Sequence, residues 1–445
     1  MRLVIVGAGY VGLPTAALFA NAGFHVDALD IRPEVINALN NGQSFTNEPG
    51  LKELISINIK SGRLKGYLNY FDYSKADAIL IAVQTPISED KKPNLVPLMK
   101  VINDVGKNMK KGTIVVVNST IPSGSTKKLI KPRLELLSGF KAEKDFYLVF
   151  VPERIAPGKA IEEFIKGTRL IGGVGKNSSK TAGKLFNTVC DRVLETDATV
   201  AEISKLAENT FRDINIAYAN QLSLICAKLG ADVIAVIKLA NTHPRVNIHL
   251  PGPGVGGPCL SKDPYYLLDG LDPFPNNIVL TSRMINEQMP EHMVCLVSKA
   301  LANIEKRMMN SRITILGVAY KNDVDDSRYS PSEPLIHSLT NLGCQIVVYD
   351  PYCKETFGAK QACSLFEAIR ESDCLVIVTN HTEFLDLDLQ KIKNLMNKNP
   401  VIVDGRRIVN PSIARKTGFI YYGIGISNIQ SKRQIKKMIE PICLQ

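Results

Sequence analysis

The hydrophobic positions of this 445-residue chain alternate between short apolar runs and longer stretches with helical spacing. Residues 2–6 form an apolar run typical of a buried parallel strand, and residues 13–22 carry apolar side chains at helical spacing up to Gly23. Residues 24–29 predict the next strand, which ends at Asp30. This order of strand, helix and strand predicts a βαβ unit and therefore a parallel sheet.

Three further apolar runs predict more strands of the same sheet, at residues 77–83, 113–118 and 147–151. Beyond them, residues 200–229 contain neither glycine nor proline and keep a helical pattern. A helix of that length spans roughly 45 Å, which suits a connector between domains or the spine of a dimer. Two more helices are expected at residues 276–289 and 291–307, one on each side of Pro290.

The last third of the chain repeats the pattern of the first. Strands are expected at residues 312–317, 344–349, 372–379 and 401–403, and the second of them ends at Asp350 as residues 24–29 end at Asp30. We therefore predict an α/β protein with two Rossmann-like, doubly wound parallel-sheet domains, joined by a long helix and a central helical domain. The expected boundaries are 1–198, 199–308 and 309–445.

Composition adds two restrictions. Hydrophobic residues make up 45% and charged residues 22% of the chain, as in soluble globular proteins, and no apolar run approaches the roughly 20 residues of a membrane helix. The chain enters its first strand directly, so no signal peptide is expected. The nine cysteines are scattered without a CxxC pair, which favours reduced thiols in the cytoplasm and predicts neither a disulfide framework nor a metal site.

The net charge of +11 raises the question of a nucleic-acid partner. Basic residues are spread along the chain, and the only dense run, at residues 432–437, reads as a solvated helix face. Small ligands that carry phosphate account for the same excess. We therefore predict a phosphate-bearing small ligand, with no nucleic-acid and no membrane partner.

The first strand and helix enclose the dinucleotide fingerprint GxGxxG, formed by Gly7, Gly9 and Gly12. In such units the amides at the start of the helix meet a pyrophosphate. Asp30 at the end of the second strand can accept a hydrogen bond from the ribose 2′-hydroxyl, which favours NAD over NADP. Arg32 leaves NADP open as an alternative, because an arginine there can hold the 2′-phosphate.

Further polar residues follow the expected strand ends. Thr85, Thr120 and Glu153 come after three neighbouring strands, and ligands of parallel sheets bind at that edge. The alternative for each threonine is an ordinary turn or cap. On the long helix, Lys205, Asn209 and Arg212 share one face; this is either a solvated stripe or part of a phosphate-binding site.

The most unusual stretch is the loop at residues 251–263. Its first eight residues contain four glycines and three prolines, which exclude a regular helix or strand, and Cys259, Lys262 and Asp263 follow. A thiolate is the reactive form of cysteine and a nearby cation stabilises it. The loop is therefore either the cradle of a covalent nucleophile or a glycine-rich surface turn that contains a cysteine.

A nicotinamide site together with a thiol points to one type of reaction. Hydride loss from a primary alcohol gives an aldehyde, to which a thiolate can add to form a thiohemiacetal. A second hydride loss gives a thioester, and water releases the acid. This combination predicts four-electron oxidation of an alcohol to an acid, since a simple alcohol dehydrogenase has no use for the cysteine.

Eight motifs in order along the chain resemble those of the UDP-glucose/GDP-mannose dehydrogenase family over essentially the full length. They are GAGYVG (7–12), NSTIPSG (118–124), PER (152–154), KLAENTFRDINIA (205–217), HPRVN (243–247), GPGVGGPCLSKD (252–263), GVAYKNDVDDSR (317–328) and DGR (404–406). The resemblance implies oxidation at C6 of a nucleotide sugar with two NAD per turnover.

The resemblance also implies roles for residues at matching positions. Catalytic roles fall to Cys259 as nucleophile, and to Lys205, Asn209, Asp263, Thr120 and Glu153 around the oxyanion and the hydrolytic water. Expected NAD contacts are Gly7, Gly9, Tyr10, Val11, Gly12, Asp30, Arg32, Thr85, Thr120, Lys262 and Arg328. Expected nucleotide-sugar contacts are Arg154, Ile155, Lys205, Asn209, Arg212, His243, Arg245, Gly256, Tyr320, Lys321 and Arg406.

Within the family, the sequence resembles the branch that oxidises UDP-N-acetylhexosamines for polysaccharide biosynthesis. UDP-glucose enzymes carry a second glutamate four residues after the first, whereas Pro157 and Gly158 follow Glu153 here. UDP-N-acetyl-D-mannosamine is the expected substrate, with UDP-N-acetylglucosamine and UDP-glucose as alternatives. The resemblance further implies a homodimer or a dimer of dimers through residues 200–229, with Arg245 reaching the neighbouring subunit.

Two other functions remain open from the sequence. One is a two-electron hydroxyacid dehydrogenase with the same layout, and the other is a nucleotide-binding scaffold without catalysis. The presence of Lys205, Asn209, Cys259 and Asp263 argues against the scaffold.

Overall fold

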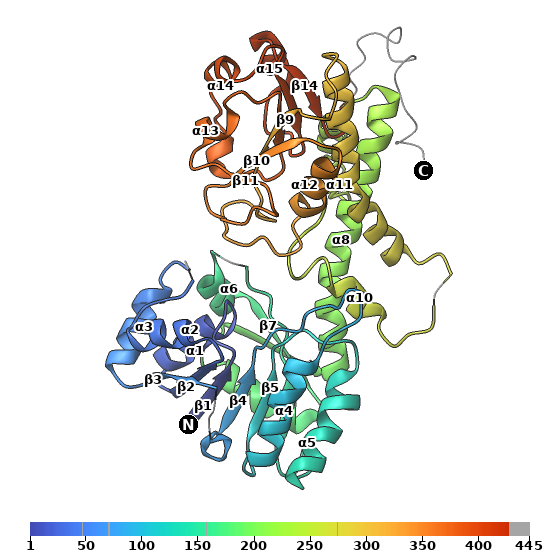
Figure 1. Ribbon diagram of the computed structural model, residues 1–445. Helices are drawn as coiled ribbons and strands as arrows, with labels where there is room; N and C mark the ends of the chain where they lie inside the picture. The colour runs from blue at the N-terminus through green and yellow to red at the C-terminus, as the bar shows by residue number, and fades with distance from the viewer. Residues whose placement is uncertain (47, 70–71, 157, 274, 427–445) are drawn as a thin grey trace. The chain divides into compact units, whose positions relative to one another are not determined.

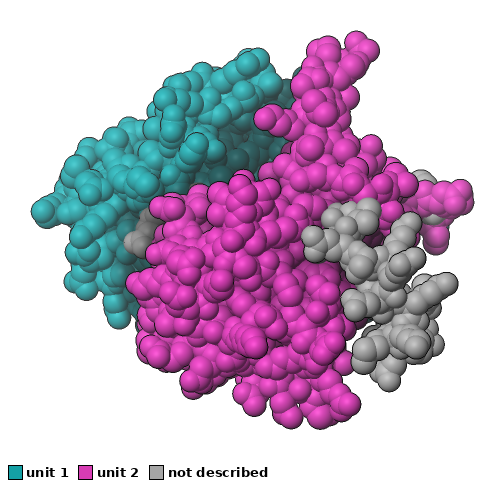
Figure 2. All heavy atoms as spheres, turned by 90° about the horizontal axis from the view of Figure 1, so that it is seen from above, with its two compact units in different colours: residues 1–208, 265–272 teal, residues 209–264, 273–445 magenta. Residues whose placement is uncertain are grey.

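The computed structural model describes residues 1–46, 48–69, 72–156, 158–273 and 275–426, so that Pro157 and the basic run at residues 432–437 lie outside the described part. Two compact units make up the chain (Figure 2). Unit 1 comprises Met1–Glu208 and Tyr265–Asp272, and unit 2 comprises Asn209–Pro264 and Pro273–Gln445. The division into three domains at residues 198 and 308 stays a prediction.

Unit 1 is built on an eight-stranded sheet with the order β3-β2-β1-β4-β5-β6-β7-β8 (Figure 1). Its strands are β1 (Arg2–Val6), β2 (His25–Asp30), β3 (Leu64–Leu68), β4 (Ala78–Ile81), β5 (Ile114–Val117), β6 (Tyr147–Phe150), β7 (Thr168–Gly173) and β8 (Arg192–Asp197). All neighbouring strands run parallel except β6 and β7, which are antiparallel. The predicted parallel sheet is confirmed, and the antiparallel pair is a departure that the apolar pattern did not indicate.

Helices cover both faces of this sheet. They are α1 (Gly12–Asn21), α2 (Pro33–Asn40), α3 (Leu51–Lys60), α4 (Val96–Asn108), α5 (Lys131–Ser138), α6 (Ala160–Lys166), α7 (Lys176–Phe186) and the start of α8 (Ala198–Leu229), with short turns η1 (Tyr73–Lys75) and η2 (Thr126–Ile130). Side chains of β1 alternate between two cores: Leu3 and Ile5 belong to one, Val4 and Val6 to the other. This alternation explains why β1 is apolar throughout.

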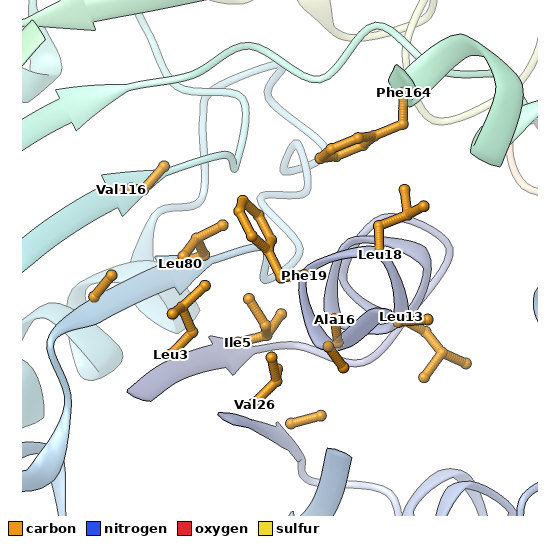
Figure 3. Packing of buried hydrophobic residues seen from close by; sticks show 14 of the residues in the cluster. Leu3, Ile5, Leu13, Ala16, Leu18, Phe19, Val26, Leu80, Val116 and Phe164 are labelled. Carbon is orange, nitrogen blue, oxygen red and sulfur yellow. The ribbon is translucent and has the colours of Figure 1, made fainter. Parts of the chain in front are cut away.

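Helix α1 is buried from Gly12 to Ala20, which explains its apolar character on all sides. Its Phe19 ring makes edge contacts with Phe24, Phe164 and Phe186 at centroid distances of 5.8, 6.4 and 5.5 Å. Figure 3 shows the Phe19 ring above the strand side chains of Leu3 and Ile5, with Leu80 and Val116 to its left. This packing holds the first helical turn, where the glycine loop ends, against the sheet.

Unit 2 contains a six-stranded parallel sheet with the order β11-β10-β9-β12-β13-β14. The strands are β9 (Arg312–Leu316), β10 (Gln345–Tyr349), β11 (Lys360–Gln361), β12 (Cys374–Ile377), β13 (Val401–Asp404) and β14 (Ile420–Gly423). Its helices are the rest of α8, α9 (Val233–Ala240), α11 (Ile278–Ala302), α12 (Ser332–Asn341), α13 (Leu365–Ile369), α14 (Leu389–Leu395) and α15 (Pro411–Thr417), with the turn η3 (Thr382–Phe384). Helix α10 (Asp263–Leu268) begins in unit 2 and continues into unit 1.

The second sheet repeats the first even in the contacts of one carboxylate at a strand end. Asp30 Oδ2 accepts a hydrogen bond from the Ala8 amide, and Asp350 Oδ2 accepts hydrogen bonds from the amides of Val318 and Ala319. Asp350 is also bonded to His381 Nε2 at 2.9 Å. Burial raises the pKa of Asp350, but His381 and these amides outweigh burial and lower it to about 2. The Asp350 carboxylate is therefore held by the loop that follows β9 and by His381.

The two helices expected around Pro290 are a single one. Helix α11 runs from Ile278 to Ala302 with Pro290 inside it. An internal proline costs a helix about 3 kcal/mol or more, because it removes one hydrogen bond and crowds the preceding turn. Met289 and Met293, on either side of it, are fully buried in the core of the second sheet, and this packing keeps the helix continuous. The predicted break was wrong.

Candidate active site

The glycine loop between β1 and α1 has the form of a dinucleotide cradle. Gly7 has a φ of +96°, and a Cβ there would lie 2.5 Å from the Ala82 carbonyl oxygen, while a Cβ on Gly12 would lie 1.8 Å from the Gly7 carbonyl oxygen. A Cβ on Gly9 would meet only Arg32 Nη2, at 3.9 Å. No side chain caps α1 at Val11. Gly7 and Gly12 are therefore required by packing, and Gly9 leaves room for a ligand at the helix end.

Asp30 and Arg32 form one ion pair beside this loop. Asp30 Oδ1 accepts from Arg32 Nε at 3.0 Å and Oδ2 from Nη2 at 3.1 Å, and the guanidinium lies over the Phe45 ring. Burial raises the pKa of Asp30, but the hydrogen bonds and charge of Arg32 outweigh it and hold the pKa below its usual value. Asp30 therefore remains an anionic hydrogen-bond acceptor, and its carboxylate neutralises part of the charge of Arg32. Tyr10, another residue that the sequence predicts to contact NAD, is 47% exposed.

Thr85 and Thr120 meet at the carboxyl edge of the sheet, as the sequence predicts. The Thr85 hydroxyl donates to the Thr120 carbonyl at 2.7 Å. Tyr266, a fully buried residue that the sequence analysis did not single out, donates its hydroxyl to the carbonyls of Thr85 and Pro86 at 2.8 and 3.0 Å. These contacts fix the backbone on which both threonines lie.

Glu153 follows β6 and is held through one of its two oxygens. Oε1 accepts from the amides of Arg154 and Ile155 at 2.7 and 3.0 Å and from Arg169 Nη1 at 3.0 Å. Oε2 is buried and has no hydrogen-bond partner among the described residues. Arg169 is 2% exposed and lies 4.1 Å from the centre of the Phe164 ring. The carboxylate is therefore fixed in place with one acceptor oxygen to spare, which suits the holding of a water molecule.

Two expected sugar contacts of unit 1 take part in internal interactions. Arg154 donates from Nε to Glu208 Oε2 at 3.2 Å and from Nη1 to the Thr168 carbonyl at 2.9 Å. Ile155 packs its side chain against the core and offers only backbone to a ligand. Lys205 is half-buried on α8, one turn before Asn209.

Glu202 is a buried carboxylate on α8 that sequence reasoning missed. It accepts from the Gly124 amide at 2.5 Å and from the amide and hydroxyl of Thr126 at 2.8 and 2.6 Å. Burial raises its pKa above the usual value despite these bonds. The sequence does contain a sign of this burial. Ala198, Glu202 and Leu206 follow one another at intervals of four residues, the spacing of one helix face, and Glu202 is the acid among these three. The contact ties α8 to the loop that carries Thr120.

In unit 2, the residues of the nucleophile loop come together. Cys259 is exposed in the turn before α10, and its carbonyl accepts from the amides of Lys262 and Asp263 at 3.1 and 2.9 Å. Asn209 Nδ2 donates to Asp263 Oδ2 at 2.6 Å, and both residues are buried. Lys262 Nζ lies 3.9 Å from Asp263 Oδ1. The structure therefore brings Lys262, Asp263 and Asn209 together, one turn after Cys259, and the joint role of these residues stays a prediction.

Arg328 belongs to the same neighbourhood. Its hydrogen bond to Asp326 raises the pKa of Arg328 above the usual value, burial opposes this, and the charge of Cys259 adds to the rise. A residue expected to contact NAD thus also lies within electrostatic reach of the thiol.

The glycines of the loop face the protein itself. A Cβ on Gly257, whose φ is +86°, would lie 2.5 Å from the Tyr320 ring, and a Cβ on Gly256 would lie 2.5 Å from the Tyr329 carbonyl oxygen. The Gly257 amide donates to the Arg328 carbonyl at 3.0 Å. These glycines are needed so that the loop can pack against residues 320–331, and a role of Gly256 in sugar binding stays a prediction.

Arg406 follows β13 and is a poorly compensated cation. It donates from Nε to the Val378 carbonyl at 2.8 Å, and burial lowers its pKa to about 10, with Asp404 opposing the shift. A Cβ on Gly252 would lie 2.8 Å from Arg406 Nη1. A half-buried cation of this kind is stabilised by an anionic ligand such as a pyrophosphate.

The remaining expected sugar contacts lie at the surface of unit 2. Arg212, His243, Arg245 and Lys321 are exposed, and the Arg245 amide donates to His243 Nδ1 at 3.3 Å. Burial lowers the pKa of His249, and the charge of Arg212 lowers it further. The face predicted from residues 205, 209 and 212 is thus divided, because Asn209 is buried and Arg212 is exposed.

Three family models match the chain in order. The NAD binding domain of the UDP-glucose/GDP-mannose dehydrogenase family matches residues 1–190, the central domain residues 199–288 and the UDP binding domain residues 314–411. UDP-N-acetyl-D-mannosamine dehydrogenase from Pyrococcus horikoshii is 39% identical over 431 residues, which cover 96% of this chain and 100% of that protein. The chain belongs to the UDP-glucose/GDP-mannose dehydrogenase family.

Solved structures of this family superpose closely. The P. horikoshii UDP-N-acetyl-D-mannosamine dehydrogenase gives a TM-score of 0.90 over 96% of this chain and 99% of that one. The UDP-N-acetyl-mannosamine dehydrogenase of Staphylococcus aureus is 36% identical with a TM-score of 0.84, covering 96% and 98%. The NDP-N-acetyl-D-galactosaminuronic acid dehydrogenase of Methanosarcina mazei is 36% identical with a TM-score of 0.85, covering 96% and 95%.

Membership of the UDP-glucose/GDP-mannose dehydrogenase family confirms the predicted fold class, the cofactor NAD and the class of enzyme, an oxidoreductase of UDP-sugars. The residues of unit 1 fit NAD, because Gly9 leaves space at an uncapped helix end and Asp30 remains an anionic acceptor. Within the described ranges, no helix is long and apolar enough to cross a bilayer, and no group of three or more metal-ligating side chains occurs.

The ion pair of Asp30 and Arg32 predicts how cofactor preference responds to mutation. We expect Asp30→Asn to lower kcat/KM for NAD at least about tenfold, because the charged acceptor of the ribose hydroxyl is lost, while the Ala8 amide keeps an acceptor. Activity with NADP should rise, because Arg32 is released to hold a 2′-phosphate. Initial rates with both cofactors test this. In the control, Asp30→Asn combined with Arg32→Ala, the gain with NADP should disappear; a gain that persists would contradict the role of Arg32.

Proposed function

We propose that the protein oxidises the C6 hydroxyl of UDP-N-acetyl-D-mannosamine to the carboxylate, giving UDP-N-acetyl-D-mannosaminuronate. The observation that carries this proposal is the buried bond from Asn209 to Asp263, whose amide in turn donates to the Cys259 carbonyl, in a member of this family. The named relatives support the choice of sugar, because UDP-N-acetyl-D-mannosamine dehydrogenases match nearly the full chain at 34–39% identity. Polysaccharide biosynthesis is the process we infer for the product.

In the proposed reaction, bound NAD supplies the hydride acceptor, and two NAD are consumed for each sugar. Lys205 takes the proton of the C6 hydroxyl and stabilises the alkoxide as the first hydride leaves. The Cys259 thiolate then adds to the aldehyde carbon, forming a thiohemiacetal whose oxygen is stabilised by Lys205 and Asn209. Loss of the second hydride gives a thioester, which water attacks to release the acid and the thiol.

Several contacts support this division of work. Asn209 holds Asp263 through a buried hydrogen bond, so that the carboxylate stays oriented. Glu153 is fixed by Arg169 and two amides and has a spare buried oxygen, which suits a water molecule for thioester hydrolysis. Arg406 is the cation we assign to the substrate pyrophosphate, because it is half-buried and has only a partial counter-charge in Asp404.

We further propose that the protein acts in the cytoplasm as a homodimer or as a dimer of dimers. A thiol nucleophile has to stay reduced, which favours that compartment. Phe211, Tyr218 and Ile225 recur every seventh residue of α8 and are 63%, 55% and 43% exposed. Large apolar side chains at this spacing form one stripe, and a second copy of the same stripe is its natural partner. The exposed Arg245 can then serve the neighbouring subunit.

Comparing sugars tests the assignment of substrate. NADH formation is measured with UDP-N-acetyl-D-mannosamine, UDP-N-acetylglucosamine, UDP-glucose and UDP-N-acetylgalactosamine, the last because of the M. mazei relative. We expect kcat/KM to be highest for the mannosamine by at least about tenfold, with two NADH for each uronate. A ratio of one would refute the four-electron reaction. Absence of NADH with all four sugars would favour the non-catalytic scaffold.

Replacing the thiol tests the mechanism. We expect Cys259→Ser to lower the rate of uronate formation by roughly a thousandfold or more, because a serine hydroxyl is not ionised at neutral pH, while NAD still binds. Cys363→Ser is the matched control, since Cys363 is another exposed cysteine, on the sheet domain of unit 2. Acid production that stays near normal in Cys259→Ser would refute the role of Cys259 as nucleophile.

A charge in the apolar stripe tests the dimer. Tyr218→Glu should reduce the molar mass measured by light scattering to that of one chain, because a buried interface does not tolerate unpaired carboxylates. Leu136→Glu, at a 74% exposed leucine on α5, should leave the mass unchanged. A Tyr218→Glu protein with the mass of the unmodified assembly would show that α8 is not the interface.

A further inference from the structure

A buried polar network lies beneath the nucleophile loop and is not used by the proposed chemistry. Arg283 Nη1 donates to Asp213 Oδ1 at 2.7 Å, and Asn286 Nδ2 donates to the same oxygen at 2.8 Å. Asn220 Nδ2 donates to Asn286 Oδ1 at 2.9 Å. These four side chains come from α8 and α11, and none is more than 2% exposed. The network therefore crosses the interior between the two helices.

The network reaches the loop at two points. Asn220 Oδ1 accepts from the Gly252 amide at 2.9 Å, and Arg283 Nη1 donates to the Leu260 carbonyl at 3.3 Å. Gly252 lies near the start of the glycine- and proline-rich stretch, and Leu260 directly follows Cys259. Proline lacks an amide hydrogen and the stretch belongs to no sheet, so at Gly252 and Leu260 side chains supply hydrogen bonds that no ladder provides. Both ends of the loop are thus fixed by residues outside it.

Stability alone does not explain these buried charges. Asp213 Oδ2 and Arg283 Nε are buried without a hydrogen-bond partner among the described residues. Replacing a buried ion pair by apolar residues of similar volume is often neutral or stabilising, so an incompletely bonded pair adds little to the free energy of folding. Burial lowers the pKa of Arg283, but Asp213 and Glu287 outweigh it, and Arg283 remains a cation. Its two donor nitrogens give a fixed direction that an apolar side chain lacks.

We propose that Arg283 and Asn220 are positioning residues for Cys259: by holding Gly252 and Leu260 they fix both ends of the loop, and so fix where the loop presents its thiol. This inference rests on the proposed function, in which Cys259 attacks the aldehyde carbon. Neither residue touches the substrate in this role. The attacking sulfur must lie close to the carbon and in line with it, and a displacement of about 1 Å can lower the rate about a hundredfold.

The test uses Arg283→Lys and Asn220→Ala in the full-length protein. Lysine keeps the positive charge that Asp213 needs, so the protein should fold, but one ammonium group cannot reproduce the contacts of Nη1 to Asp213 and Leu260 together with that of Nη2 to Glu287. We expect kcat for uronate formation to fall about 10- to 100-fold in each variant. Binding of NAD and of UDP, measured by calorimetry, should change less than about threefold, because neither residue contacts those ligands.

A second readout follows the thiol directly. Alkylation of Cys259 by iodoacetamide, read by mass spectrometry of its peptide against pH, should change its midpoint in both variants, because the loop that carries the thiol is no longer held at Gly252 or at Leu260. This measurement needs no sugar, so it remains informative even if Cys259→Ser shows that the proposed mechanism is wrong. In that case uronate formation persists without the thiol, whereas failure of the positioning role leaves the alkylation profile unchanged.

Arg407→Lys is the matched control. Arg407 is also a largely buried arginine, which donates to Asp232 Oδ2 at 2.8 Å and to the Ile424 carbonyl at 3.0 Å, away from the loop. We expect its alkylation profile to match that of the unmodified protein. An unchanged midpoint in both Arg283→Lys and Asn220→Ala would overturn the proposal. An equal shift in Arg407→Lys would also overturn it, because the effect would then reflect general loosening of unit 2.

Discussion

A polar group that is buried away from water needs a hydrogen-bond partner inside the protein. Several polar residues on the buried face of α8 meet this requirement. Glu202 binds the loop that carries Thr120, and Asn209 binds Asp263. Asp213 and Asn220 bind α11, and Asn220 also binds the start of the nucleophile loop. Each of these partners either lies in a loop or is hydrogen-bonded to a loop residue. The irregular segments that carry the chemistry are therefore placed by polar residues of a regular helix, and an apolar helix of the same length could not place them.

The two sheets share one architecture, but the carboxylate at the equivalent strand end has different partners in each. Asp30 and Asp350 occupy equivalent strand ends and accept from the amides of equivalent loops. At the first, the remaining partner is Arg32, a surface group that a ligand can compete with. At the second, His381 is completely buried and completes the coordination of the carboxylate. The repeat thus keeps the architecture and changes the partners of the carboxylate.

Much of this was readable in the sequence, because the informative residues are close together along the chain. The GxGxxG loop, Asp30 and the stretch before Cys259 are local patterns with local physical requirements. Arg169, Tyr266 and Arg283 were not found, since each acts on a partner far away in sequence and nothing nearby marks it. The predicted helix break at Pro290 was wrong for the opposite reason. Proline locally disfavours a helix, but the packing of Met289 and Met293 outweighs this preference. Glu202 lies between these cases, as an acid at a position with core spacing.

The contact between Gly257 and the Tyr320 ring has a consequence for exchange of parts between relatives. Since no side chain fits at position 257, the loop and the segment at residues 320–331 form one interlocked surface with a fixed shape. A chimaera that joins the C-terminal sheet of one relative to the helices of another at residue 309 would separate the two halves of this surface. Recombination at the start of unit 2 would keep them together. The loop at residues 251–263 and the segment at residues 320–331 are therefore inherited as one module, and change in the sequence of either is limited by the other.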